Sequence, residues 1–184
     1  MDLIRRFNGV LSADEILLIR QLMDPIVDQH DDTFTRTKSK LSGVPGFLTK
    51  KLSNVVEESN RHFGFDIFSP VKFESFTYGR YGPGDSCAVH NDIPTVHYFT
   101  PETRKLSVVI GFNNGTDYDG GDFVFSATTD IDQLNLDSIH EIDRLKLNAG
   151  DVVIYPGFVY HEVQEVTAGF RESLTTMVLG PRYK

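Results

Sequence analysis

The feature that most constrains this chain is a succession of short β-rich runs that begins after Pro70. These runs lie at residues 71–78, 86–90, 106–112, 122–125, 151–155, 161–165 and 171–179, and clusters of Gly, Pro, Asn and Asp separate them. No helical period intervenes, so the pattern predicts about eight strands in a sandwich or barrel. A jelly roll is favoured because its mouth can shelter a ligand site.

The part before residue 70 is predicted to be largely helical. Ser12 and Glu15 form a capping-box pattern ahead of apolar residues at helical spacing, which predicts a helix over 13–28. A second helix is predicted over 45–62, with Gly64 placed to end it. The polar segment 31–42 shows no clear period and is predicted to be a mobile loop, either a solvated connector or a lid that contacts substrate.

These elements together predict a mainly β fold with flanking N-terminal helices (α+β). A length of 184 residues suits one domain over 1–184, with a helical part at 1–69 and a jelly-roll core at 70–184. Two long connections remain, at 91–105 and 127–144. The first is expected to rim the site described below with Thr95, His97, Tyr98 and Phe99.

Charge and composition exclude several kinds of partner. The net charge is −8 and no Lys/Arg-rich block is present, which argues against a nucleic acid. No run approaches the roughly 18 apolar residues of a membrane helix, so no membrane association is predicted. Cys87 is the one cysteine, which excludes an internal disulfide and indicates a reducing, cytoplasmic setting. Nothing in the sequence indicates an oligomeric state.

Three residues form a candidate metal site. His90 and Asp92 are two positions apart, so on an extended strand both side chains leave the same face. His161 follows another strand-like run and can supply a third ligand. Two imidazoles and one carboxylate leave coordination positions open, as in non-haem Fe(II) oxygenases. Open positions indicate catalysis rather than a closed structural site.

A candidate anion site follows His161 in the sequence. The run from Arg171 alternates, which places Arg171, Ser173 and Thr175 on one face of a strand. A guanidinium flanked by hydroxyls can hold a carboxylate through charge-assisted hydrogen bonds.

These motifs resemble the signature of 2-oxoglutarate/Fe(II) dioxygenases of the prolyl 4-hydroxylase type. The resemblance rests on His90-X-Asp92 and on His161, Val163, Val166, Gly169, Arg171 and Ser173 in that order. Further matches are the runs 81–84, 120–122 and 150–155. It extends closely over about residues 71–181 and implies a double-stranded β-helix.

The resemblance also implies a reaction and roles for residues. Fe(II) would be held by His90, Asp92 and His161, and 2-oxoglutarate by Arg171 with Ser173, Thr175 and Tyr81. With O₂, and with ascorbate as a candidate additional cofactor, such an enzyme hydroxylates an unactivated C–H bond and releases succinate and CO₂. The implied substrate is a prolyl residue of a protein or peptide. One departure is Gly111, which stands where some prolyl hydroxylases have a tyrosine.

Other interpretations of the same residues remain open. His97 is a rival ligand, and a zinc hydrolase could use the same three residues but has no need of Arg171. Cys87 is expected, from strand parity with His90, to face away from the metal. The substrate could instead be a lysyl residue, a free amino acid or a small metabolite. From another class, the chain could be a non-catalytic jelly-roll module that binds a metal or a carboxylate.

Overall fold

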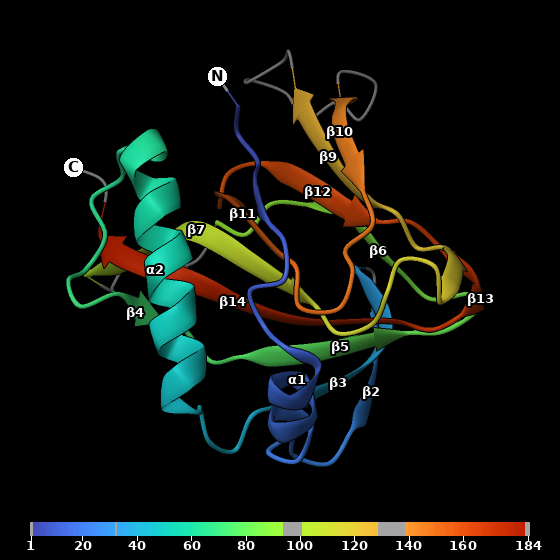
Figure 1. The fold of residues 1–184 in the computed structure, drawn as a ribbon. Helices are drawn as coiled ribbons and strands as arrows, with labels where there is room; N and C mark the ends of the chain where they lie inside the picture. The colour runs from blue at the N-terminus through green and yellow to red at the C-terminus, as the bar shows by residue number, and fades with distance from the viewer. Residues whose placement is uncertain (1, 32, 94–100, 129–138, 183–184) are drawn as a thin grey trace.

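The computed structural model describes residues 2–31, 33–93, 101–128 and 139–182, and Figure 1 shows their arrangement. Its main feature is one curled antiparallel sheet. The strand order is β1-β11-β7-β14-β5-β3-β6-β12-β9-β10, with β2 beside β3 and β4 beside β14. The strands that follow the predicted runs are β5 (Thr77–Tyr81), β6 (Ser86–His90), β7 (Glu102–Gly111), β9 (Phe123–Thr128), β11 (Val152–Pro156), β12 (Tyr160–Val163) and β14 (Arg171–Pro181).

Two apolar cores form because neighbouring residues of these strands face opposite sides of the sheet. On β7, Val108 and Ile110 pack toward the helices, whereas Val109 packs into the interior of the curl. The inner core also contains aromatic residues of β9 and β11, among them Phe125 and Tyr155. The inner side of the sheet is therefore the side on which a site can form.

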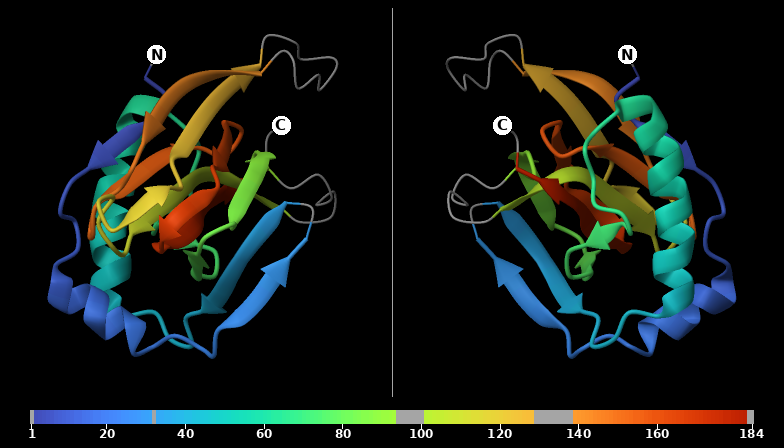
Figure 2. Two further views of the ribbon diagram at one scale, coloured as in Figure 1. Left: turned by 90° about the vertical axis from the view of Figure 1, so that its right-hand side faces the viewer. Right: turned by 90° about the vertical axis from the view of Figure 1, so that its left-hand side faces the viewer.

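Both predicted helices exist and pack on the outer face. Helix α2 (Gly46–Phe63) buries Leu48, Leu52 and Val56 completely and ends at Gly64, which has a positive φ of 72°. Figures 1 and 2 show it lying across β7, β11 and β14. Helix α1 (Ala13–Arg20) has the predicted capping box but is shorter than predicted, because the chain bends before Pro25 and then forms a strand. No described helix is long and apolar enough to cross a membrane.

The prediction of a mobile loop at 31–42 is wrong. Residues of this segment form β3 (Phe34–Lys40), which makes a hairpin with β2 (Val27–His30) and pairs with both β5 and β6. The basic residues of β3 do alternate with small hydroxyl residues, which is the period of a strand. Because both faces are polar, this alternation carries no hydrophobic signal.

Most of the remaining elements lie outside the predicted runs. The N-terminal part contributes β1 (Arg5–Phe7), which pairs with β11, so residues 1–69 are not only helical. The predicted run 71–78 is divided into β4 (Lys72–Phe73) and β5. The end of the connection 127–144 forms most of β10 (Ile139–Leu145), which pairs with β9. Finally, β8 (Tyr118–Gly120) and β13 (Val166–Gly169) form a separate two-stranded sheet.

Candidate metal centre and adjoining pocket

The three candidate ligands meet at one point on the inner side of the sheet. His161 of β12 lies directly opposite His90 of β6 in the strand register. Asp92 follows β6, and two hydrogen bonds hold its backbone. The N–H of Asp92 donates to the carbonyl of Gly157 at 2.9 Å, and Nη1 of Arg104 donates to the carbonyl of Asp92 at 3.1 Å. Asp92 and His161 are buried and His90 is half-buried.

The donor atoms are spaced as one ion requires. Nε2 of His90 lies 3.8 Å from Oδ1 of Asp92, and Nε2 of His161 lies 3.6 Å from Oδ2. All three ligand atoms are within 4.8 Å of one another. Donors that are each about 2.1 Å from an ion lie about 3–4 Å apart. Both nitrogen–oxygen distances fall in this range, so the residue types and their spacing suit a metal with two nitrogen ligands and one oxygen ligand.

Hydrogen bonds hold both imidazoles in the form that binds a metal. Nδ1 of His90 is 2.8 Å from the carbonyl of Ala88, and Nδ1 of His161 is 3.0 Å from that of Val159. A carbonyl only accepts, so each Nδ1–H donates and each Nε2 keeps its lone pair toward Asp92. Burial lowers the pKa of His161 to about 4, an effect that Asp92 opposes and His90 reinforces. The ring is therefore neutral at neutral pH.

Two hydroxyl groups that the sequence analysis missed orient the carboxylate. Oγ of Ser107 donates to Oδ2 of Asp92 at 2.6 Å, and the Tyr155 hydroxyl lies 3.4 Å from the same oxygen and 3.2 Å from Nε2 of His161. Burial and the charge of Asp92 raise the pKa of Tyr155 well above its usual value, so it stays protonated. Partners of this kind tune metal affinity. Tyr155 lies in the run 150–155, which matched the family signature and contained a predicted strand, but no role was assigned to its side chain.

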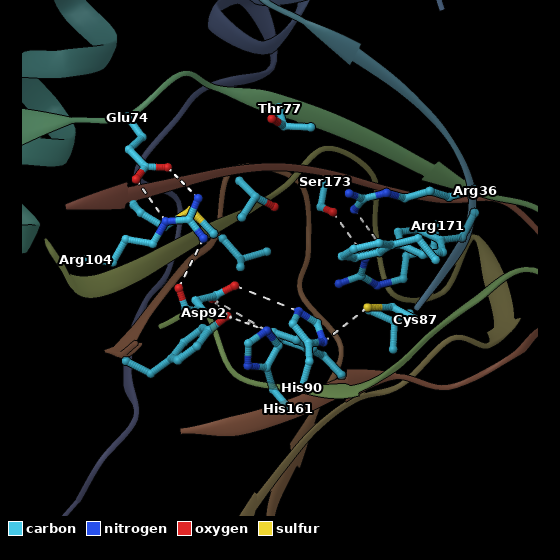
Figure 3. Close-up of a pocket in the computed structure, with 18 of the residues that line it drawn as sticks. Arg36, Glu74, Thr77, Cys87, His90, Asp92, Arg104, His161, Arg171 and Ser173 are labelled. Carbon is cyan, nitrogen blue, oxygen red and sulfur yellow. Dashed lines mark hydrogen bonds and ion pairs between the residues drawn. The ribbon is translucent and has the colours of Figure 1, made fainter. Parts of the chain in front are cut away.

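A cavity of about 290 Å³ extends from the three ligands, and its other side is formed by β14 and β3. In Figure 3, Arg171 and Arg36 lie on one side of this cavity, the three ligands lie below, and a Glu74–Arg104 pair lies opposite. The predicted alternation on β14 is present. Arg171, Ser173 and Thr175 line the cavity, whereas Glu172 on the other face forms an ion pair with Arg20.

Arg171 is a buried cation without a carboxylate partner among the described residues. Its Nη1 donates to Oγ of Ser173 at 3.1 Å, and its guanidinium faces the rings of Tyr81 and Phe123 at 5.4 and 5.6 Å. It also contacts the Tyr118 phenol. Because a buried charge without a counter-ion is costly, this arrangement favours an anionic ligand at Arg171.

Tyr81 lies in the same cavity, as predicted, but its hydroxyl has an unexpected partner. Nη1 of Arg36 on β3 donates to this hydroxyl at 2.8 Å. The tyrosine oxygen thus accepts from Arg36, which leaves its own O–H available to a ligand. Sequence reasoning missed Arg36 because it assigned its segment to a loop. A Cβ at Gly111 would meet the carbonyl oxygen of Asn148 at 2.3 Å, so no tyrosine could replace Gly111 without a shift of the backbone.

The expected orientation of Cys87 is wrong. Its Sγ lies 3.5 Å from Nδ1 of His90, and the residue lines the cavity. The register explains why: His90 pairs with His161, but Cys87 pairs with Val163, so three residues of β6 correspond to two of β12. Such a bulge reverses strand parity. The rival ligand His97 and its neighbours Thr95, Tyr98 and Phe99 lie outside the described residues.

Three comparisons relate the chain to known proteins. A family model described as the 2OG-Fe(II) oxygenase superfamily matches residues 76–178. A PKHD-type hydroxylase of Hyphomonas neptunium is 28% identical over 146 residues, which are 78% of this chain and 56% of that protein. The PKHD-type hydroxylase PiuC of Pseudomonas aeruginosa is 34% identical over 105 residues, 55% of this chain and 42% of that one. The chain thus spans about half the length of these relatives.

Solved structures confirm the fold. A prolyl-4-hydroxylase of Pseudomonas putida superposes with a TM-score of 0.65 at 18% identity, covering 98% of this chain and 94% of that one. A viral collagen prolyl hydroxylase of Paramecium bursaria Chlorella virus 1, solved with 2OG, has a TM-score of 0.65 at 14% identity and covers 97% of both chains. The predicted double-stranded β-helix is therefore correct.

Proposed function

The chain belongs to the 2OG-Fe(II) oxygenase superfamily, and from this premise we propose that it is a hydroxylase that binds Fe(II) through His90, Asp92 and His161. The cofactor and cosubstrate predicted from the sequence are those in the family's description. The proposal is carried by one observation: three ligand atoms within 4.8 Å of one another share a cavity with a buried arginine that has no carboxylate partner in the described part of the chain.

The residues of the chain would divide the work between metal and cosubstrate. His90, Asp92 and His161 would occupy one side of the ion and leave positions open to 2-oxoglutarate and O₂. Arg171 with Ser173 would hold the distal carboxylate, and Tyr81 would donate its free O–H to the same group. Thr175 lies further along the same face and completes that side of the cavity.

Bound Fe(II) would supply the activation of O₂ that couples conversion of 2-oxoglutarate into succinate and CO₂ to insertion of one oxygen atom into a substrate C–H bond. The protein's contribution is positioning and exclusion of water. Apolar and aromatic side chains of the inner core, including Phe123 and Val109, line the cavity beside the ligands. Zinc hydrolysis would use the same three ligands but leaves the buried Arg171 without a role.

The substrate that we propose is a prolyl residue of a protein or peptide. Support comes from the names of the relatives, and one structural neighbour is a prolyl hydroxylase solved with a peptide fragment of a hypoxia-inducible factor. A lysyl residue, a free amino acid and a small metabolite are the competing substrates. We further propose that residues 1–184 act as one catalytic domain, since β1 and β3 lie in the same sheet as His90 and His161. We place this domain in the cytoplasm, because the single Cys87 indicates a reducing setting, which suits ferrous iron.

The test is an anaerobic titration of the purified protein with Fe(II) and 2-oxoglutarate. We expect the weak visible charge-transfer band of a chelated Fe(II)–2-oxoglutarate complex, and its loss in His161→Ala. Exposure to air should then release succinate in an amount that depends on 2-oxoglutarate, with ascorbate tested as an additive. If iron binds but neither band nor succinate appears, the oxygenase proposal fails and a non-catalytic metal-binding module takes its place.

A further inference from the structure

A groove runs along strand β3, next to the cavity that extends from the three candidate ligands, which we call the iron cavity. The groove has a volume of about 380 Å³ and is lined by Arg36, Lys38 and Lys40 on one face of the strand, with Asp24 as the one carboxylate in its lining among the described residues. Arg36, Lys40 and Thr77 line both the groove and the iron cavity. These shared residues place the groove beside the cavity that contains the candidate metal ligands.

Arg36 is held in place without a carboxylate partner in the described part of the chain. Its guanidinium stacks on the ring of Phe34 at 4.2 Å and donates to Tyr81, and its buried Nε has no hydrogen-bond partner. The Arg36 side chain crosses β5 at Gly79, where an added Cβ would lie 3.1 Å from Nη1 of Arg36. The absence of a side chain at residue 79 thus leaves room for this guanidinium.

A count of the charges in the occupied cavity leaves the positive charges of Arg36 and Lys40 without negative partners. The two positive charges of Fe(II) would face three negative charges, from Asp92 and the two carboxylates of 2-oxoglutarate, and Arg171 would balance the remainder. Glu74 forms a two-pronged ion pair with Arg104, at 2.9 and 2.8 Å. With the cofactor and cosubstrate in place, Arg36 and Lys40 would still lack a carboxylate partner among the residues that the structure describes, and the groove would stay net positive with Asp24 in its lining.

We propose that Arg36 and Lys40 bind an acidic side chain that flanks the target residue of a peptide substrate. This inference rests on the proposed function and specifies the substrate class of that site. An acidic peptide would supply the missing negative charge, because carboxylates bind guanidinium and ammonium groups in matched geometry. Lys38 on the same face would meet a second acidic residue further along the peptide.

The shape of the groove favours a peptide over a small acid. Arg36, Lys38 and Lys40 are successive residues on one face of β3, so they extend over about 13 Å. A free amino acid would engage only the residues at the junction, whereas an extended peptide would follow the whole row. Val27, an exposed apolar residue of the neighbouring strand β2, also lines this groove.

The experiment compares three labelled peptides of equal length with a central proline flanked by Glu, Gln or Lys. Binding to the anaerobic Fe(II)–2-oxoglutarate protein is measured by fluorescence anisotropy, so no turnover is needed. We expect the Glu peptide to bind on the order of tenfold more tightly than the Gln peptide, about 1.4 kcal/mol, with a smaller difference at high salt. In the double variant Arg36→Glu/Lys40→Glu, the Lys peptide should become the tightest. Lys50→Glu is the matched control, because Lys50 is exposed on α2 and lines neither cavity.

Equal binding of the three peptides, or no binding of any, would overturn the inference if the Fe(II)–2-oxoglutarate band is present in the same samples. Absence of the band would instead mean that the proposed function has failed. A requirement for more 2-oxoglutarate in Arg36→Gln, with the Glu preference unchanged, would assign Arg36 to the cosubstrate and also overturn the inference. Competition by free L-glutamate without binding of the Glu peptide would overturn the peptide as the source of the carboxylate.

Discussion

Asp92 links the ligands of the candidate metal site to the residues around them. Both imidazoles face its carboxylate, at 3.8 and 3.6 Å, while Ser107 and Tyr155 contact the oxygen nearer His161. The carboxylate is therefore oriented before a metal arrives. Orientation of this kind lowers the entropic cost of binding, because fewer rotamers are lost when the ion is captured.

Ser107→Ala tests this orientation. The substitution removes the 2.6 Å hydrogen bond to Asp92 but leaves all three ligands, so we expect Fe(II) affinity to fall by about 10–100-fold. Anaerobic competition against a chelator measures the affinity. Ser59→Ala is the matched control, because Ser59 is also fully buried but bonds to the backbone of α2. Unchanged iron affinity in Ser107→Ala would show that the hydrogen bond has no role in holding Asp92.

Arg171→Gln separates the cosubstrate from the metal. Loss of the buried guanidinium should raise the KM for 2-oxoglutarate at least tenfold, because a charge-assisted pair with a carboxylate is replaced by a neutral contact. Fe(II) affinity should change little, since Arg171 is not among the ligands. Steady-state succinate release gives the KM, and Arg61→Gln on α2 serves as the control. An unchanged KM for 2-oxoglutarate would remove Arg171 from the cosubstrate site.

At the scale of single residues, the sequence indicated the chemistry but not its supports. His90, Asp92, His161 and Arg171 were singled out because their spacing is that of a known signature, and the structure brings them to one cavity. Ser107, Tyr155 and Arg36 were missed because their roles depend on contacts between strands distant in the chain. The orientation of Cys87 was wrong because a β-bulge between paired strands leaves no pattern in one strand alone.

At the scale of elements, strand β3 shows the same limit of prediction from sequence, because its role depends on pairing with distant strands. It pairs with β5 and, at its start, with β6, and so joins the part of the sheet with Arg171 to the part with His90. The hydrophobic strands of the core were predictable because apolar residues alternate or cluster there. A strand with a polar inner face toward a cavity lacks that signal, and only the alternation of Arg36, Lys38 and Lys40 indicated it.

Helix α1 is joined to the sheet by an ion pair whose pH dependence can be predicted. Nη2 of Arg20 lies 2.5 Å from Oε2 of Glu172 on β14, and the Tyr78 hydroxyl donates to the same carboxylate. Burial alone would raise the pKa of Glu172, but these hydrogen bonds outweigh it and hold the pKa below its usual value of 4.5. Glu172 therefore stabilises the fold above pH 4.5, and this contribution is lost as the pH falls through the lowered pKa.

Glu172→Gln should lower the free energy of unfolding at pH 7 by about 1–3 kcal/mol, because Arg20 loses its charged partner. The difference between wild type and variant should shrink as the pH falls below 4.5. Urea unfolding at a series of pH values measures both effects, and Glu57→Gln, at an exposed position of α2, provides the control. A difference that stays constant with pH would contradict the ion pair as the source of the stability.

For the whole molecule, the candidate ligands connect segments that are far apart in the sequence. His90 and His161 come from adjacent strands β6 and β12, and Asp92 is tied to the chain before β12 through Gly157. An unfolded chain would not hold these three groups together, so a metal should bind the folded state almost exclusively. Metal binding is then linked to global stability and gives a readout that does not depend on catalysis.

We therefore expect Mn(II), used in place of oxidisable Fe(II), to stabilise the protein. At a free concentration 100 times its Kd, one site adds about 2.7 kcal/mol to the free energy of unfolding. For a chain of this size that corresponds to a rise in Tm of about 5–10 °C. The rise should disappear in His161→Ala and persist in His140→Ala, since His140 is exposed on β10 and lies outside the ligand group. An equal rise in both variants would mean that the metal binds elsewhere, and the assignment of the three ligands would then be wrong.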